Sequence, residues 1–236
     1  RQEGSTGIPD YSALIKDGIV PSQLTTGNIH FHECHPTRFI DACASLYAED
    51  PLNSQMIVAT NDTKDAINKY CQATFNGAAE PLIVDMGYRK FGTKFRKGDP
   101  VIFTKNNYEV DIQNGTLGKL ISVTPNEKTG SFGEVVLDGG RKVLITQELL
   151  AKMDLAYAIT LHKGQGSQFK RVIVVVENSG LVDRSWVYTG ITRTEVELHL
   201  LGAEHKLISA ITGLSAKYKR QTYLADLLRE HIEPLA

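Results

Sequence analysis

The interpretation of the chain starts from one stretch, Leu155-Ala156-Tyr157-Ala158-Ile159-Thr160-Leu161-His162-Lys163-Gly164-Gln165-Gly166-Ser167-Gln168-Phe169. Here an apolar run ends in a compact group of hydroxyl, imidazole, ammonium and amide side chains around two glycines. Gly164 and Gly166 let the backbone come close to a ligand and leave amide groups free to point at it. The apolar run at residues 171–176 then predicts a strand buried on both faces. Four side chains of the stretch are suited to holding phosphate oxygens: Thr160, His162, Lys163 and Gln165.

Length and composition are those of an ordinary globular protein. The chain has 236 residues, of which 42% are hydrophobic and 22% charged, so it is long enough to bury a sizeable core. No apolar run approaches the roughly 20 residues that span a bilayer, and we expect no membrane partner. The cysteines Cys34, Cys43 and Cys71 are widely spaced and odd in number, which favours a reducing, cytoplasmic location. Because the net charge is −1, any nucleic-acid-binding surface should be local.

The first segment, residues 1–24, has apolar residues at helical spacing, followed by Gly18 and Pro21. Taken alone, this pattern predicts a short amphipathic helix that ends at a glycine. The segment has neither an initiator Met nor the apolar core of a signal peptide, and we expect a cut made inside a longer chain.

Residues 28–35 contain several potential metal ligands. His30, His32 and His35 lie close to Glu33 and Cys34, which would suit a metal-dependent enzyme. A strand explains the same spacing, because alternate side chains share one face without forming a tetrahedral site. No second half-site of metal-ligand spacing follows, so we favour the strand and predict no metal.

Residues 54–75 predict a short buried strand followed by a helix. Thr60 and Asn61 lie between them, where short hydroxyl and amide side chains cap a helix. The end of a parallel strand is also the usual ligand edge of an α/β sheet. A cap needs no ligand, so both interpretations stay open at this point.

The chain changes character at residues 91–152. Short apolar runs are separated by turn signals such as Asn114-Gly115 and Asp138-Gly139-Gly140, spaced about 8–12 residues apart. This pattern predicts a small antiparallel barrel inserted into an otherwise alternating series of strands and helices.

Residues 183–201 predict a helix followed by a strand, with Arg193 at the helix end. A solvated charge at a helix C-terminus is an ordinary surface feature, favoured by the helix dipole. The residues alone therefore do not make Arg193 functional.

Two motifs in sequence order carry a resemblance to a known family. Residues 155–169 resemble motif V of RecD-like superfamily 1 helicases, and residues 187–194, Val-Tyr-Thr-Gly-Ile-Thr-Arg-Thr, resemble their motif VI. Arg1-Gln2 with Gly18 and Pro21 is similar to motif IV. Residues 95–118 are similar to the SH3-like barrel of these proteins, and residues 220–228 to their tail. The resemblance covers nearly the whole chain.

The resemblance implies a role for each site residue. Arg193 and Arg1 would reach the γ-phosphate of ATP as catalytic arginines, with Gln168 and Gly166 near the nucleotide. Phosphates of single-stranded DNA would contact residues of motif V and of the segment after the second predicted strand, namely Thr160, His162, Lys163, Gln165, Thr60 and Asn61. Gln168 stands where the family has an acid, which puts nucleotide preference in doubt. Gly190 and Thr194 stand where alanine is usual, and Gly190 would loosen the helix before Arg193 by about 0.5–1 kcal/mol.

The implied fold is α/β: a RecA-like parallel sheet with flanking helices, interrupted by an SH3-like β-barrel. The expected parts are a first motor segment at 1–90, the barrel at 91–152 and a second motor segment at 153–236. No G-x-x-x-x-G-K-[ST] loop occurs in the sequence, so ATP and Mg²⁺ would be bound mainly by an N-terminal RecA-like domain of the same parent chain.

The implied function is the C-terminal half of an ATP-dependent DNA helicase, inactive as an ATP hydrolase by itself. The parent would be a repair helicase, a recombination-nuclease subunit (exonuclease V alpha-like) or a conjugative relaxase. The alternatives are a non-catalytic module, derived from a helicase, that binds single-stranded DNA or protein, and the metal-dependent enzyme considered above.

Overall fold

The computed structural model describes residues 7–85, 90–126 and 128–213. Its centre is a parallel sheet of five strands in the order β1-β12-β11-β2-β10. These strands are β1 (Ile29–Glu33), β12 (Thr194–Gly202), β11 (Phe169–Val176), β2 (Ser54–Val58) and β10 (Ala158–Thr160). Strands β1 and β2 come from the first part of the sequence and β10, β11 and β12 from the last part, so both parts contribute to one sheet. The β1–β12 pair aligns His30 with His199. The predicted α/β class with a parallel sheet is confirmed.

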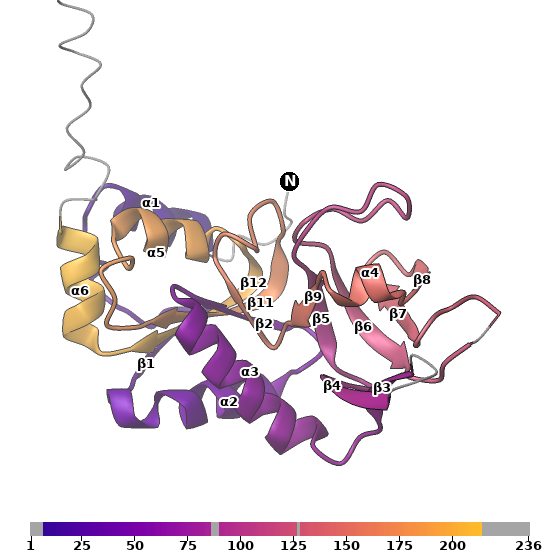
Figure 1. Ribbon diagram of the computed structural model, residues 1–236. Coiled ribbons are helices and arrows are strands. Elements are labelled where there is room, and N and C mark those ends of the chain that lie inside the picture. Colours follow the sequence, from indigo (N-terminus) through magenta and orange to yellow (C-terminus); the bar gives the residue numbers. More distant parts are fainter. Residues whose placement is uncertain (1–6, 86–89, 127, 214–236) are drawn as a thin grey trace, which may run out of the picture.

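Helices cover both faces of the parallel sheet (Figure 1). One face carries α1 (Ile8–Lys16), α5 (Arg184–Ile191) and α6 (Glu204–Thr212). The other carries the short η1 (Pro36–Arg38), α2 (Phe39–Glu49) and α3 (Asn61–Asn76). Alternation along β11 explains the two layers, because Val172 and Val174 pack toward α1 and α5 while Ile173 and Val175 pack toward α2 and α3.

Side-chain caps define where helices α3 and α5 begin. The Thr60 hydroxyl accepts a hydrogen bond from the Thr63 amide at the start of α3, and the Asp183 carboxylate accepts one from the Trp186 amide at the start of α5. Each cap satisfies an amide that has no partner within its own helix. The tail expected by resemblance at residues 220–228 lies outside the described residues.

An antiparallel insert follows α3. Its sheet has the order β8-β7-β6-β5-β9, with β5 (Pro100–Phe103), β6 (Leu117–Ser122), β7 (Glu134–Leu137), β8 (Lys142–Leu144) and β9 (Met153–Leu155). The short α4 (Gln147–Leu150) precedes β9, and a separate hairpin consists of β3 (Pro81–Asp85) and β4 (Lys90–Arg96). None of the described strands of the insert pairs with the parallel sheet. The end strands β8 and β9 do not pair with each other in the described part, so the SH3-like barrel and its limits at 91–152 stay predictions.

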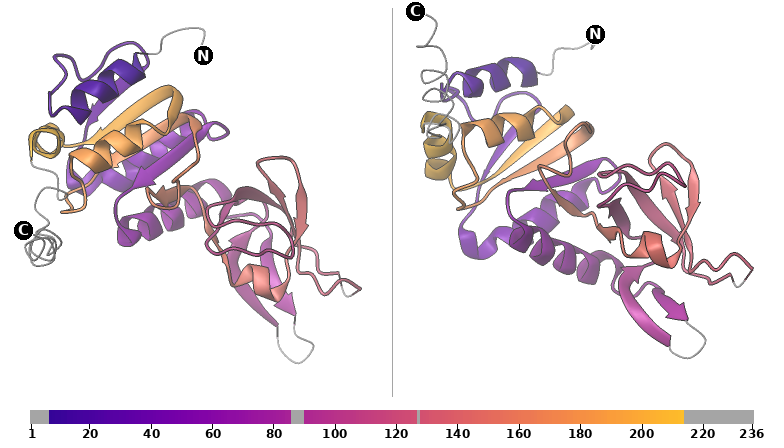
Figure 2. Two further views of the ribbon diagram at one scale, coloured as in Figure 1. Left: turned by 90° about the horizontal axis from the view of Figure 1, so that it is seen from above. Right: turned by 45° about the horizontal axis from the view of Figure 1, so that its top comes forward.

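The insert projects from one side of the parallel sheet in both views of Figure 2. A fully buried carboxylate, Asp99, joins the two parts. It accepts hydrogen bonds from Gln72 (2.5 Å) and Asn76 (2.6 Å) of α3 and from the Tyr157 hydroxyl (2.9 Å). The Arg96 amide adds a fourth bond at 2.7 Å. Because a buried carboxylate is costly unless its oxygens are hydrogen-bonded, this joint fixes α3, the insert and the start of the 155–169 stretch in one arrangement.

A second carboxylate, Asp154, strengthens the same joint. It lies 2.7 Å from Lys64 Nζ on α3 and 2.5 Å from Lys94 Nζ on β4. Most buried side chains of the insert belong to the same apolar cluster as those between the parallel sheet and helices α2 and α3. The insert and this face of the parallel sheet therefore share one core. Among the described helices, none has the length and apolar character that a membrane crossing requires.

Candidate functional site

The structure divides the predicted site residues between two edges of the parallel sheet. Thr160 ends β10 and aligns with Val58 at the end of β2, so Thr160, Thr60 and Asn61 lie at the carboxyl edge. Arg193 directly precedes β12, so it lies at the amino edge. The loop of residues 161–168 connects β10 to β11 and runs from the first edge to the second.

Thr60 lies in a dense hydrogen-bond network at the corner between β2 and α3. Its amide donates to Glu177 Oε1 at 2.8 Å, and the Ala59 amide donates to the same oxygen at 2.6 Å. The Thr60 hydroxyl lies 2.9 Å from Glu177 Oε2, which the Thr63 hydroxyl also contacts. Asn61, the next residue, is exposed. Thr60 is therefore held in place by Glu177, while Asn61 faces solvent.

The loop of residues 161–168 presents its polar groups to solvent. His162, Gln165, Gly166 and Gln168 are exposed, and Thr160 is half-buried. The Thr160 hydroxyl and the His162 ring have no hydrogen-bond partner among the described residues, so both are available to a ligand. The positive φ of 90° at Gly166 belongs to the left-handed region, in which a side chain would be strained.

Lys163 occupies a different environment from its neighbours in the loop. Its Nζ donates to the Thr104 carbonyl at 3.0 Å and to Asn114 Oδ1 at 2.7 Å, both in the insert. A Cβ atom on Gly115 would lie 2.9 Å from the Lys163 carbonyl oxygen, so the two backbones are in close contact. Lys163 thus joins the loop to the insert. An ammonium has three N–H donors, so one remains for a ligand.

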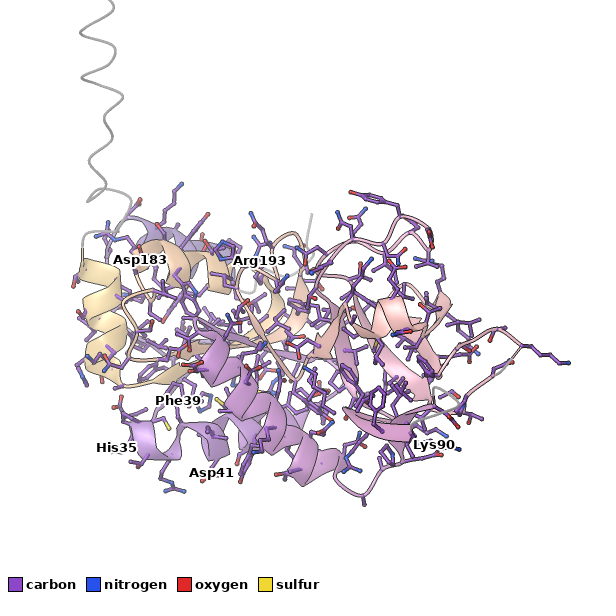
Figure 3. All side chains as sticks on the ribbon, in the orientation of Figure 1. His35, Phe39, Asp41, Lys90, Asp183 and Arg193 are labelled. Carbon is purple, nitrogen blue, oxygen red and sulfur yellow. The ribbon has the colours of Figure 1, made fainter. Side chains whose placement is uncertain are left out.

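Arg193 lies on the α5 side of the sheet, away from His35 and Phe39 (Figure 3). Its guanidinium makes two long hydrogen bonds to carbonyl oxygens, Nε to Thr189 at 3.4 Å and Nη1 to Ser167 at 3.3 Å. It pairs with no carboxylate within the described ranges. No carboxylate in these ranges therefore offsets the positive charge of the guanidinium, which has further N–H donors for an anion.

The next residue, Thr194, is buried, and its hydroxyl has no hydrogen-bond partner among the described residues. The alanine expected by resemblance at this position would avoid that cost.

Histidines gather on the face of the sheet that carries α2, but not as a metal site. His199 lies with its ring centroid 5.0 Å from that of His30 and 5.1 Å from that of His32. His35 instead caps η1 by accepting from the Thr37 amide. Burial lowers the pKa of His199 to about 3, with the nearby Arg171 guanidinium acting in the same direction. Among the described residues, no group of three or more His, Cys, Asp and Glu side chains is arranged to hold a metal ion.

The carboxyl edge also holds a cavity of about 760 Å³ beside the β2–α3 corner. Its apolar wall includes Cys34, Phe39 and Val176, and its rim includes Thr63 and Glu177.

Known proteins resemble this chain in sequence. A family model, the UvrD-like helicase C-terminal domain, matches residues 155–201. The ATP-dependent RecD2 DNA helicase of Deinococcus radiodurans is 30% identical over 169 residues, which are 71% of this chain and 22% of that protein. The RecBCD enzyme subunit RecD of Mycolicibacterium smegmatis is 31% identical over 140 residues, 58% of this chain and 22% of that protein. A probable conjugal transfer protein TraA of Sinorhizobium fredii is 30% identical over 184 residues, 74% of this chain and 16% of that protein.

Solved structures of Pif1 helicases share the fold. The Candida albicans protein has a TM-score of 0.55 at 17% identity and covers 95% of this chain and 58% of its own. The Bacteroides protein, in complex with ADP-AlF3 and single-stranded DNA, has a TM-score of 0.53 at 17% identity, over 95% and 53% of the two chains.

These matches support a C-terminal domain like that of the RecD-like superfamily 1 helicases. This RecD-like domain spans 22% of the length of the RecD2 helicase that it matches. Of the expected catalytic arginines, Arg193 is described, and Arg1 lies outside the described residues.

Two residues that organise the RecD-like domain were not predicted from its sequence. Glu177 follows an apolar strand with no motif around it, and its hydrogen-bond partners lie more than a hundred residues earlier in the chain. Asp99 stood in a turn pattern, Gly98-Asp99-Pro100, which suggests a structural role but gives no sign of its partners on α3. The spacing of residues along the chain carries no signal for either network.

Proposed function

We propose that this RecD-like domain is the C-terminal motor half of an ATP-dependent DNA helicase or translocase. ATP and Mg²⁺ are bound mainly by an N-terminal RecA-like domain of the same parent chain. This domain supplies Arg193, together with Arg1, to the γ-phosphate across the cleft between the halves. It holds the phosphates of single-stranded DNA at the carboxyl edge of its sheet.

One observation carries the proposal. The loop of residues 161–168 begins at Thr160 on the carboxyl edge and reaches Ser167, whose carbonyl contacts Arg193 on the amino edge. We expect a displacement of Arg193 on nucleotide binding to be passed along this short loop to the residues that hold the strand. This is the connection that coupling between hydrolysis and movement requires.

The chemistry of Arg193 suits phosphoryl transfer. Charge spreads over the equatorial oxygens of the γ-phosphoryl group in the transition state, and a forked guanidinium stabilises it better than a point charge does. The carbonyls of Thr189 and Ser167 orient the guanidinium without neutralising it. Gly166 and Gln168, exposed in the same loop, are the residues nearest to a bound nucleotide.

The strand-binding part consists of groups that recognise phosphates rather than bases. The free hydroxyl of Thr160, the exposed ring of His162, the amides of Gln165 and Asn61 and the remaining donor of Lys163 all suit phosphate oxygens. Such contacts carry no sequence information, as stepping along any strand requires. The Pif1 helicase of Bacteroides with single-stranded DNA supports this proposal through its similar fold.

Binding of fluorescent single-stranded oligonucleotides to the full-length parent tests the proposal. Thr160→Ala and His162→Ala should each weaken binding by roughly 1–2 kcal/mol, because each removes a hydrogen bond to a charged group. The loss should be equal for unrelated base sequences. Thr124→Ala, an exposed threonine on the insert, is the matched control and should leave the affinity unchanged. A loss restricted to one base sequence would contradict the phosphate assignment.

A further inference from the structure

A carboxylate occupies the strand-binding corner, where the resemblance places a phosphate contact. Glu177 directly follows β11 and reaches across to the junction of β2 and α3. Its two oxygens accept four hydrogen bonds, from the amides of Ala59 and Thr60 and from the hydroxyls of Thr60 and Thr63. No Lys or Arg in the described ranges forms an ion pair with it. The amides and hydroxyls at the β2–α3 junction therefore satisfy both oxygens of the carboxylate.

The donors at this corner are fully used. Thr60 has one hydroxyl proton, and both of its acceptors, Glu177 Oε2 and Thr63 Oγ1, lie at 2.9 Å. The Thr60 oxygen also accepts from the Thr63 amide at 3.2 Å. The amides of Ala59 and Thr60, which at the head of a helix would attract an anion, point at Glu177 instead. Nothing in this set is left to donate to a phosphate.

Asn61 differs from Thr60 in the one respect that matters for a ligand. It is the first residue of α3, and its side chain is exposed. Within the described part of the chain, this side chain has no hydrogen-bond partner. Its amide group can donate to a phosphate oxygen without breaking any contact of the corner.

We infer that Glu177 is the positioning residue of the strand-binding corner: it occupies the anion position at the head of α3, so that the strand meets Asn61 and not Thr60. Thr60 then acts only through Glu177, by fixing the corner that presents Asn61. The inference rests on the proposed function for its strand contact, while the positioning of the corner stands independently.

Amide hydrogen exchange tests the positioning without any ligand. In Glu177→Ala, both acceptor oxygens are removed, so the amides of Ala59 and Thr60 lose the acceptor that they share. Exchange at the amides of Ala59 and Thr60 should then rise about tenfold or more, while Leu200 in the centre of β12 is unchanged. Unchanged protection at Ala59 and Thr60 would overturn the positioning role. Equal acceleration at Leu200 would also overturn it, because the substitution would then act on the whole fold.

A double-mutant cycle with single-stranded DNA, in the full-length parent, tests the strand contact. Asn61→Ala should weaken binding roughly tenfold in both the wild-type and the Glu177→Ala backgrounds. Thr60→Ala should weaken binding in the wild-type background and have no further effect in Glu177→Ala, whereas Thr60→Ser should retain wild-type affinity. An equal loss from Thr60→Ala in both backgrounds would overturn the inference, because it would show a direct contact.

Two further outcomes separate the inference from the proposed function. Tighter binding by Glu177→Gln would show that the carboxylate merely repels the strand, which overturns the inference while leaving the proposed function standing. Absence of wild-type binding would contradict the proposed function and the contact through Asn61 together. In that case the exchange measurement alone decides whether Glu177 positions the corner.

Discussion

Arg193 is held loosely, by two carbonyl oxygens at 3.3 and 3.4 Å, and its charge is not neutralised. Arg184, the first residue of α5, instead donates to the Ile211 carbonyl at 2.7 Å and also reaches Gly213. The first arrangement leaves the guanidinium available to a substrate, and the second ties α5 to the end of α6. The two arginines should therefore respond differently to the same substitution.

We predict that Arg193→Lys in the full-length parent lowers kcat for DNA-stimulated ATP hydrolysis by about 10²-fold or more, because lysine offers a point charge in place of a fork. Affinity for single-stranded DNA and the melting temperature should scarcely change. Arg184→Lys is the control, and it should lower the melting temperature while leaving kcat per folded molecule intact. A large loss of stability in Arg193→Lys with kcat preserved would make Arg193 a structural residue.

His199 should make the stability of the domain depend on pH. It is buried against His32, at 2.9 Å between ring nitrogens, and against His30, Glu197 and the Arg171 guanidinium. Burial lowers its pKa from 6.5 to about 3. Between pH 6.5 and about pH 3, this histidine is therefore protonated in the unfolded chain and neutral in the folded chain. Stability from this group is complete above pH 6.5 and is lost as the pH falls. The lowered pKa of His32, caused first by burial, acts in the same direction.

Urea unfolding at pH 7.5, 6.5, 5.5 and 5.0 measures this effect. Each pH unit below 6.5 should cost at most about 1.4 kcal/mol for His199, or about 2 kcal/mol by pH 5. The paired carboxylate of Asp154, whose pKa is lowered by Lys64 and Lys94 despite its burial, adds nothing until more acidic pH. His199→Gln should flatten the pH dependence, and the exposed His205→Gln should not. An unchanged slope in His199→Gln would show that another group titrates.

The residues proposed to contact substrate could be named from the sequence, whereas the residue proposed to position them could not. Thr160, His162 and Arg193 lie in contiguous motifs, so a short stretch of sequence carries the resemblance that assigns them. Glu177 acts through residues 114 to 118 positions away, and its partners are chosen by the strand order of the sheet. The position of Glu177 after an apolar strand does not indicate which strand lies next to it, so its partners could not be predicted.

At the scale of elements, the joint between the loop 161–168 and the insert depends on Lys163. Lys163→Met keeps the apolar stem and removes the bonds to Thr104 and Asn114. Hydrogen exchange at residues 104–116 should accelerate several-fold, and the free energy of unfolding should fall by about 1–2 kcal/mol. Lys105→Met, an exposed lysine of the same loop of the insert, is the matched control. Weaker DNA binding without faster exchange would show that Lys163 serves the strand alone.

Periodicity predicted the type of most elements but not how they pair. The uninterrupted apolar run of β11 and the capping residues before α3 marked these two elements correctly. The short strands β9 and β10 were hidden in one apolar run, although they belong to different sheets. The change of sheet is imposed by Asp99 binding Tyr157 and by Asn68 binding the backbone of Ala158, and both partners are distant in sequence.

At the scale of the whole molecule, we predict that the 236-residue chain does not hydrolyse ATP above background, because no loop for the β- and γ-phosphates occurs in its sequence. Phosphate release should appear in the full-length parent and should be lost again there on Arg193→Ala. Measuring the chain, the parent and this variant under one set of conditions checks the prediction. Turnover by the chain alone, retained in Arg193→Ala, would place the nucleotide chemistry elsewhere.

The interleaved strand order has a consequence for synthesis of the protein on the ribosome. In the described sheet, β1 pairs only with β12, and β2 pairs only with β10 and β11, all of which follow the insert. While the first half of the nascent chain emerges, these apolar strands have no strand to join. The insert, whose strands are contiguous in sequence, can be complete by residue 155. Ribosome stalling before residue 194 therefore leaves a folded insert attached to an exposed, unpaired β1, the kind of edge that chaperones bind and that aggregates form from.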